Sequence, residues 1–191
     1  MIQKKEIKKS PPRNKNKDGD TSSCLNIIIA GVGGQGVVLL SKVIMHYFLK
    51  QGYDVKRSEV HGMSQRGGSV VVDIRIGKTV YSPTIAFGCV DFLLAVDEKE
   101  GAYILEKHKQ VGSHLFLNDE EKARLVYPKS KNIALLAKFF CQLSKKSIVV
   151  GGEKFSGNYE KAKLALKEIL PPLLLPANLK VFEDYFPPTS A

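Results

Sequence analysis

The chain has 191 residues, 43% of them hydrophobic and 25% charged, which suits one soluble globular domain and is too short for two. No apolar run approaches the roughly 18 residues of a membrane span, and no apolar segment follows the basic N-terminal residues, so we expect neither a membrane anchor nor a secretory signal. Three cysteines, far apart and in apolar surroundings, predict buried or half-buried thiols of a reducing compartment and hence a cytoplasmic protein: Cys24, Cys89 and Cys141.

The net charge of +10 is unevenly distributed. Residues 1–23 hold seven Lys/Arg and three Asp/Glu, few apolar residues and no periodicity, which predicts a disordered basic tail. The other lysines are scattered and no nucleic-acid-binding motif is present, so no specific nucleic-acid partner is expected. The folded domain is expected over residues 24–187.

The first elements form a βαβ pattern. Leu25 to Ala30 is an apolar, mostly β-branched run that is typical of a buried parallel strand. A glycine-rich turn follows, and then Val37 to about Gln51 predicts a helix with one apolar face. His46 belongs to the polar face of this helix and is predicted to be solvated rather than catalytic. Residues 53–58 return as a second strand.

The pattern then departs from an ordinary nucleotide-binding fold, because no helix follows the second strand. "VVVDIRIGKTVYS" predicts a hairpin that turns at Gly77 and Lys78. Further strands are predicted at 90–97 and 113–118, and further helices at 98–108, 132–143 and 159–170, with Asn132 as a helix cap. Residues 147–152 fit either a strand or the start of a helix. The sum is an α/β fold: a single Rossmann-like domain with a mainly parallel sheet and an inserted β-hairpin.

The stretch "GVGGQG" fits G-x-G-x-x-G between a strand and a helix, with glycines at positions 31, 33 and 36. Such a turn presents backbone N–H groups and the positive end of a helix dipole, which suit a phosphate or carboxylate. Alternatively, the glycines only permit close packing of helix on strand. An NAD site would also need an acid about 20 residues onward, and Glu59 qualifies.

A second glycine-rich stretch, "EVHGMSQRGGS", offers a carboxylate, an imidazole, an amide and a guanidinium within eight residues. A ribose-binding turn does not call for such density. His61 and Arg66 together suit an anionic group or a carbonyl oxygen. Gly67 and Gly68 would let the backbone approach a ligand or a neighbouring chain. The alternative is an interface loop in which Arg66 pairs with Glu59 or with a partner's carboxylate.

These two stretches carry a family resemblance. "NIIIAGVGGQGVVLLSKVI", "GYDVKRSEVHGMSQRGGSVVVDIRIG" and "VYSP" resemble the γ-type domain of the 2-oxoacid:ferredoxin oxidoreductases, in particular the β subunit of indolepyruvate:ferredoxin oxidoreductase. The resemblance runs from about Leu25 to Asp97 and reappears at "LPANLKVFEDYF". The combination of G-x-G-G-Q-G with E-x-H-G-x-x-Q-R-G-G is its most specific part.

The resemblance implies one subunit of a cytoplasmic hetero-oligomer that decarboxylates a 2-oxoacid, indolepyruvate or another aryl pyruvate, reduces ferredoxin and releases an acyl-coenzyme A. A larger partner subunit would hold thiamine diphosphate, Mg²⁺ and the iron–sulfur clusters, because this chain lacks the motifs for them. This chain would complete the active site and help bind coenzyme A. Two alternatives are a stand-alone NAD(P)-binding oxidoreductase and a non-catalytic scaffold.

Specific residues follow from the two loops. His61 and Arg66 are the candidate catalytic side chains. Asp97 ends a predicted strand at the edge where open α/β sheets bind ligands, and it is a minor candidate. The candidate cofactor-binding residues are Gly31, Gly33, Gly34, Gln35, Gly36, Glu59, Gly62, Gln65, Gly67 and Gly68.

Overall fold

The structure is a computed structural model that describes residues 24–62, 67–117, 121 and 130–188. The predicted basic tail lies outside the described residues, as do residues 63–66 in the second glycine-rich stretch.

The described elements alternate between strands and helices in the first two thirds of the chain and are mainly helical after it. They are β1 (Leu25–Val32), α1 (Val37–Leu49), β2 (Asp54–His61), β3 (Ser69–Gly77), β4 (Val90–Ala95), α2 (Glu98–His108), β5 (Val111–Leu115), α4 (Lys131–Lys145), β6 (Ile148–Val150), β7 (Glu153–Phe155), α5 (Tyr159–Ile169), a 3-10 turn (Pro172–Leu174) and α6 (Leu175–Tyr185).

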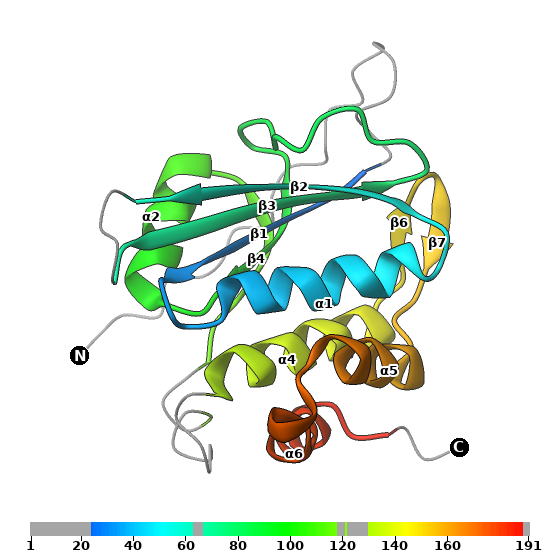
Figure 1. The fold of residues 1–191 in the computed structure, drawn as a ribbon. Coiled ribbons are helices and arrows are strands. Elements are labelled where there is room, and N and C mark those ends of the chain that lie inside the picture. Colours follow the sequence, from blue (N-terminus) through cyan, green and yellow to red (C-terminus); the bar gives the residue numbers. More distant parts are fainter. Residues whose placement is uncertain (1–23, 63–66, 118–120, 122–129, 189–191) are drawn as a thin grey trace, which may run out of the picture.

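The central sheet has the order β2-β3-β1-β4-β5 (Figure 1). β1 pairs in parallel with β4, and β4 in parallel with β5. β3 lies between β1 and β2 and is antiparallel to both. Four strands therefore share one direction, and the predicted βαβ unit is present with a reversed strand inserted into it. The predicted α/β class with a mainly parallel sheet is confirmed.

Alternate residues of β1 face two separate cores, as the period of a β-strand requires. Ile27 and Ile29 pack with the apolar side of α1, whereas Ile28 and Ala30 pack with Ile104 of α2. The helices that follow β1 and β4 thus cover opposite faces of the sheet. The crevice between the carboxyl ends of these two strands is the topological switch point, where open α/β sheets bind ligands.

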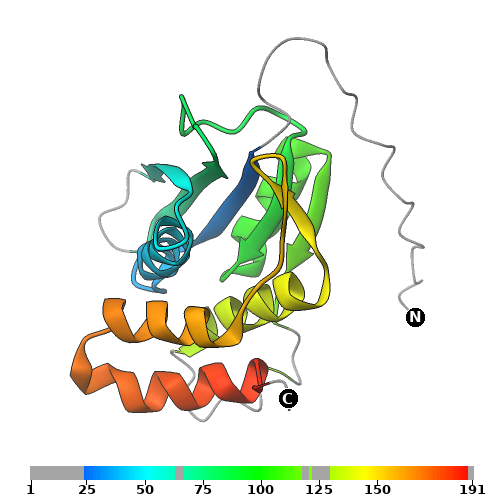
Figure 2. The same ribbon diagram turned by 90° about the vertical axis from the view of Figure 1, so that its right-hand side faces the viewer.

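Helices α5 and α6 form a further layer outside α1 and α4, on the side away from the sheet (Figure 2). Helix α4 is almost wholly buried, because it packs on the sheet and α1 on one side and on α5 and α6 on the other. Aromatic rings fill the junction: the ring centroids of Tyr47 and Phe140 are 4.6 Å apart, and those of Phe48 and Phe155 are 5.0 Å apart. This packing fixes α4 beside α1.

The structure corrects the predicted hairpin. The chain does not turn back at Gly77 and Lys78; instead β2 and β3 form the hairpin, and its tip is the second glycine-rich stretch. The physical reason is that β1 and β2 already pair with both edges of β3, so the residues after Gly77 cannot turn back to pair with β3. The ambiguous stretch 147–152 contains strand β6, which pairs with β7.

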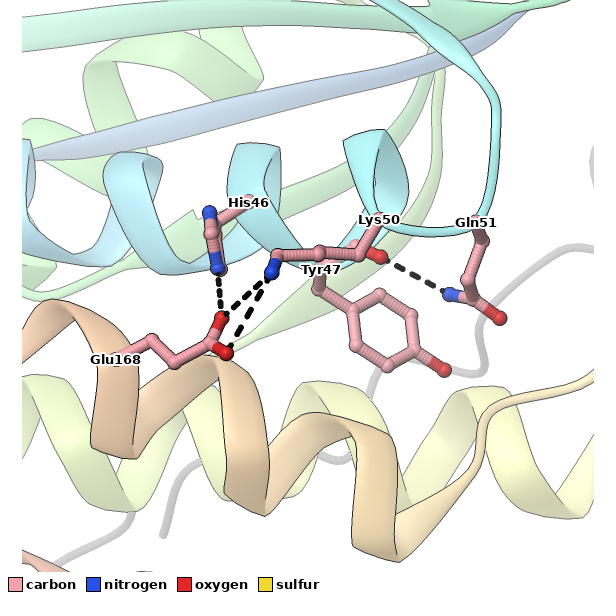
Figure 3. A network of polar contacts seen from close by, with 5 residues as sticks. All are labelled: His46, Tyr47, Lys50, Gln51 and Glu168. Atoms are coloured by element: carbon pink, nitrogen blue, oxygen red, sulfur yellow. Dashed lines mark hydrogen bonds and ion pairs between the residues drawn. The ribbon is translucent and has the colours of Figure 1, made fainter.

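The sequence predicts that His46 is solvated, whereas in the structure this side chain also contacts Glu168. Glu168 of α5 accepts hydrogen bonds from His46 and from Lys50 of α1, the latter at 3.5 Å (Figure 3). Nearby, the phenol oxygen of Tyr47 accepts a hydrogen bond from the backbone N–H of Asn158 at 3.0 Å. These contacts tie the first helix to a segment more than 100 residues away. The hydrogen bond from His46 is the main reason that the pKa of Glu168 lies below its usual value.

The Glu168→Gln variant should therefore be less stable than the wild type at pH 7. A carboxyl whose pKa is lowered by folding stabilises the native state above its unfolded pKa, and this contribution is lost as the pH falls. The difference in melting temperature should accordingly shrink as the pH drops below about 4. Circular dichroism melts across this range measure it.

The matched control is Glu106→Gln, which removes an exposed carboxylate on α2 with no ion pair among the described residues. Equal melting-temperature losses in the two variants, or a Glu168→Gln loss that grows at low pH, would contradict the proposed contact.

Candidate functional site

The first glycine-rich turn is held together by its own residues. The backbone N–H of Gln35 donates to the carbonyl oxygen of Val32 at 3.0 Å, and the N–H of Val32 donates to Oε1 of Gln35 at 2.9 Å. Gly36 has a left-handed backbone (φ 81°) and is the N-cap of α1, with no side-chain capping hydrogen bond. The side chain of Gln35 thus shapes the turn, and the N-terminus of α1 opens beside it.

The glycines of this turn have different tasks. A Cβ at Gly31 would lie 2.7 Å from Cγ2 of Val37, and one at Gly36 would lie 2.2 Å from Nδ2 of Asn132. A side chain at either position would clash, so glycine permits close packing there. Gly33 and Gly34 are exposed, and a Cβ at Gly34 would meet nothing within 4 Å. The open side of the turn therefore lies at these two residues.

The two glycine-rich stretches meet in space. The backbone N–H of Gly33 donates to the carbonyl oxygen of Gly68 at 2.9 Å, so the second stretch closes directly onto the first. At the base of the same hairpin tip, the N–H of Gly62 donates to the carbonyl oxygen of Ser69 at 2.7 Å. Gly67 has a left-handed backbone (φ 71°), which glycine adopts without strain. The backbone at Gly68 thus contacts the first glycine-rich turn, and the predicted approach of Gly67 and Gly68 to a ligand or a neighbouring chain stays a prediction.

Asp97 joins this junction from the end of β4. Its Oδ1 accepts from the backbone N–H groups of Lys99 and Glu100 at 3.0 and 3.3 Å, which caps α2. Its Oδ2 accepts from Nε2 of Gln35 at 3.4 Å. The carboxylate that the sequence suggested as a minor ligand candidate is therefore engaged in fixing the turn and a helix N-terminus.

Glu59 and His61 lie at the end of β2. Oε1 of Glu59 is 2.5 Å from Nη2 of Arg57, and its Oε2 is 3.3 Å from Nε2 of His61. Arg57 also donates to the hydroxyl of Ser41 on α1 at 2.9 Å. Because β3 separates β2 from β1, Glu59 is not on the strand next to the turn, where an NAD site places its ribose-binding acid. This arrangement argues against the NAD interpretation.

Gln65 and Arg66, the other candidates of the second stretch, lie outside the described residues. They stay predictions.

A groove of about 750 Å³ runs between α2 and the adjacent face of β2 and β3, and His61 and Gly62 line one end of it. Asp73 and His108 also line this groove. Burial raises the pKa of the Asp73 carboxyl and lowers that of the His108 imidazole, so burial disfavours the charged form of each. The exposed ring of Phe87 lies beside His108, with ring centroids 5.3 Å apart. The volume is that of an ordinary ligand pocket.

Other expectations concern metals, thiols and membranes. Cys24 is buried and Cys89 and Cys141 are half-buried, all free, as predicted. Among the described residues, no three His, Cys, Asp or Glu side chains gather in a way that suits a metal ion. In the same part of the chain no helix has the length and apolar character needed to cross a membrane.

The sequence matches the family model of pyruvate ferredoxin/flavodoxin oxidoreductase over residues 26–184. The chain belongs to this family. Indolepyruvate oxidoreductase subunit IorB of Pyrococcus horikoshii is 40% identical to it over 87 residues, which is 46% of this chain and 43% of that protein. The corresponding protein of Methanothermobacter thermautotrophicus is 42% identical over 93 residues, or 49% and 46% of the two chains. The matched region thus spans less than half the length of these curated relatives, and the predicted resemblance is confirmed.

Solved structures show the same fold. The γ subunit of a keto/oxoacid ferredoxin oxidoreductase from Geobacter sulfurreducens aligns with a TM-score of 0.58 and 19% identity over 85% of this chain and 96% of that one. A 2-oxoglutarate:ferredoxin oxidoreductase from Magnetococcus marinus, solved with 2-oxoglutarate, coenzyme A and succinyl-CoA bound, aligns with a TM-score of 0.65 and 16% identity. That alignment covers 85% of this chain and 30% of the other, so the fold is one part of a larger chain there.

The unequal tasks of the glycines predict unequal costs of substitution. Gly36→Ala should lower the free energy of unfolding by at least the ~1–2 kcal/mol of a left-handed L-residue, because the new Cβ also meets Asn132. Gly33→Ala has an ordinary backbone and ordinary contacts, and its effect should stay within about 0.5 kcal/mol. Gly34→Ala, strained at φ 90° but with open space, should lie between them.

Urea unfolding of the three variants makes the comparison. Equal losses at Gly33 and Gly36 would show that the turn is packed differently from the structure described here.

Proposed function

We propose that this chain is a subunit of a cytoplasmic, thiamine-diphosphate-dependent 2-oxoacid:ferredoxin oxidoreductase, in which it helps to bind coenzyme A and completes the active site. The observation that carries the proposal is the hydrogen bond between Gly33 and Gly68, which joins the two family-specific glycine stretches at the N-terminus of α1. An uncapped helix N-terminus favours a phosphate group, and coenzyme A carries three.

The open side of the turn suits this role. Gly33 and Gly34 are exposed, so a phosphate can approach the backbone without a side chain in its way. The N–H of Gly33 is already used by Gly68, and the side chain of Gln35 by Val32 and Asp97. We therefore assign phosphate binding to the N–H groups of Gly34 and of the first turn of α1, and assign Gln35 to positioning.

The remaining parts of the reaction need a partner. One iron–sulfur cluster takes four cysteine ligands, and this sequence has three cysteines in all. We place the clusters, thiamine diphosphate and Mg²⁺ on a larger subunit, which decarboxylates the 2-oxoacid and passes its electrons to ferredoxin. The acyl group would then be transferred to the sulfur of coenzyme A, whose thiol proton is released. Indolepyruvate or another aryl pyruvate is the proposed 2-oxoacid, because the curated relatives are indolepyruvate oxidoreductase subunits.

The second glycine-rich stretch faces this chemistry in the proposal. His61 is more than half exposed, and its Nε2 lies 3.3 Å from Oε2 of Glu59 at the end of β2. Together with Arg66 it would contact the carboxylate or carbonyl oxygen of a ligand bound between the two subunits. Glu59, held by Arg57, orients the imidazole.

The purified chain alone should not reduce ferredoxin or a viologen dye with any 2-oxoacid, whereas the complex reconstituted with the larger subunit should. The dye reduction is followed spectrophotometrically with indolepyruvate and coenzyme A, and omission of coenzyme A should slow the complex. Comparable turnover by the chain alone would refute the proposal that the thiamine diphosphate and the iron–sulfur clusters are held by the larger subunit.

Isothermal titration of the same complex separates the two earlier interpretations of the first turn. Coenzyme A should bind and NAD should not. Tight NAD binding without a coenzyme A response would favour the stand-alone dehydrogenase, and binding of neither ligand would favour the non-catalytic scaffold.

Arg66→Lys should reduce turnover of the complex by about tenfold to a hundredfold, because a guanidinium holds a carboxylate or phosphate through two hydrogen bonds and an ammonium does not. A raised KM for the 2-oxoacid or for coenzyme A would identify ligand contact, and weaker association with the larger subunit would identify an interface role. Unchanged kinetics and assembly in both Arg66→Lys and Arg66→Ala would remove this residue from the site.

A further inference from the structure

The groove between α2 and strands β2 and β3 lies on the face of the sheet opposite α1 (Figure 1). We call it the α2 groove. Ser69 and Glu100 line it near the start of α2, and Lys107 and His108 line it at the end of that helix. At 1.5 Å per residue, the helix puts about 12 Å between Glu100 and His108. The groove therefore extends from the base of the β2–β3 hairpin tip to a point well away from the first glycine-rich turn.

Three large hydrophobic residues along the α2 groove are more than half exposed: Val60, Phe87 and Tyr103, at 64%, 72% and 58%. Apolar side chains of this size that gather in a concave place mark a contact with a ligand or with another protein. Two of the three are aromatic, so they offer flat surfaces on which a ring can stack. The groove thus favours a ligand with an aromatic portion.

Polar groups in the α2 groove have unused hydrogen-bonding capacity. His108 is only 8% exposed, yet its Nδ1 has no hydrogen-bond partner in the part of the chain that the structure describes. The carboxyl of Asp73 makes one hydrogen bond among the described residues, in which Oδ2 accepts from the backbone N–H of Ile85 at the long distance of 3.4 Å. Phe87 lies beside the imidazole, with ring centroids 5.3 Å apart. Buried polar groups normally have partners, so this gathering of groups points to a ligand that supplies them.

The charges along the α2 groove narrow the kind of ligand. The carboxylates of Asp73 and Glu100 would repel a phosphate or a carboxylate. The ammonium of Lys107 lies 5.9 Å from the centroid of the Phe87 ring and disfavours a second cation there. A neutral ring avoids both penalties. A ring N–H or amino group can donate to Asp73, and a ring nitrogen can accept from the imidazole of His108.

We propose that the α2 groove binds a neutral, planar nitrogen heterocycle, which stacks on Phe87 and donates a hydrogen bond to Asp73. Adenine and indole share this chemistry, as parts of coenzyme A and of indolepyruvate, so the identity of the ring rests on the proposed function. Adenine fits better, because it also carries ring nitrogens that can accept from His108. Its ribose also separates it from the phosphates that we assign to the first turn, whereas only a methylene and a carbonyl separate indole from its carboxylate.

Phe87→Ala is the sharpest test, because the ring is largely exposed and its loss should not unfold the chain. In the complex with the larger subunit, the Kd of coenzyme A from isothermal titration should rise about fivefold or more, as expected for the loss of a stacked base. The Kd of 4′-phosphopantetheine, which lacks the adenine nucleotide, should stay unchanged. Asp73→Asn, which keeps the shape of the side chain but replaces an accepting oxygen by an N–H₂ group, should show the same selectivity.

The matched control is Tyr81→Ala, because this ring is 84% exposed but lies outside the residues that line the α2 groove. It should leave every constant unchanged, and melting temperatures of all variants check the fold. Adenosine, titrated into the purified full chain, is a probe that needs no larger subunit, since the groove is built from this chain alone. The wild type should bind adenosine more tightly than Phe87→Ala does.

The outcomes separate this inference from the proposed function. A raised KM for indolepyruvate with unchanged coenzyme A affinity supports the ring-binding groove and assigns its ring to indole. If Phe87→Ala and Asp73→Asn leave all of these constants unchanged, or weaken coenzyme A and 4′-phosphopantetheine equally, the groove does not bind the heterocycle while the proposed function stands. If the wild-type complex does not bind coenzyme A, the proposed function itself fails, and the adenosine titration decides the role of the groove.

Discussion

Strand β3 runs antiparallel between β1 and β2, and the arrangement of the candidate site depends on it. In a sheet whose other strands share one direction, only a reversed strand starts at the edge where its neighbours end. The stretch that enters β3 is therefore delivered to the turn that leaves β1, and the register pairs Ser69 with Val32. The hydrogen bond from Gly33 to Gly68 follows from this pairing. Two glycine-rich stretches more than 25 residues apart become one surface.

The same insertion changes what the first turn is suited to bind. In a dinucleotide-binding fold the second strand lies next to the first, and an acidic residue at the end of the second strand hydrogen-bonds the ribose. Here β3 occupies that place, and Glu59 is engaged with Arg57 and His61. The turn keeps its uncapped helix N-terminus, but it lacks an adjacent carboxylate that could bind a ribose. This arrangement supports the proposed phosphate-binding role of the turn rather than a nicotinamide site.

Several elements of the fold could be predicted from the sequence, and particular residues show why. Asp97 followed by an acidic first turn marks the start of α2, and the predicted helix, Glu98–His108, agrees with the structure. The β-branched run before the glycines gives β1 and the switch point. The hairpin was misplaced because a Gly-Lys pair is a good local turn signal, whereas the position of β3 between two strands is a long-range property.

Asn132 shows the same limit. An asparagine before an apolar run predicts a helix cap, yet the structure has Ser130 as the N-cap and places Asn132 two residues later, in the first turn of α4. What matters about this residue is its distance from Gly36, almost a hundred positions earlier, and no local pattern reports such a distance. Helix α6 was also missed, since its start contains a proline that reads as a break although it lies in the first turn, where it is tolerated.

A structure of the complex with the larger subunit, determined with coenzyme A bound, tests the central claim most directly. Our account predicts a phosphate of coenzyme A at the N-terminus of α1, within hydrogen-bond distance of the backbone N–H of Gly34 or of the first turn of that helix. Coenzyme A bound with all of its phosphates away from this turn would contradict the account, even if the complex were active.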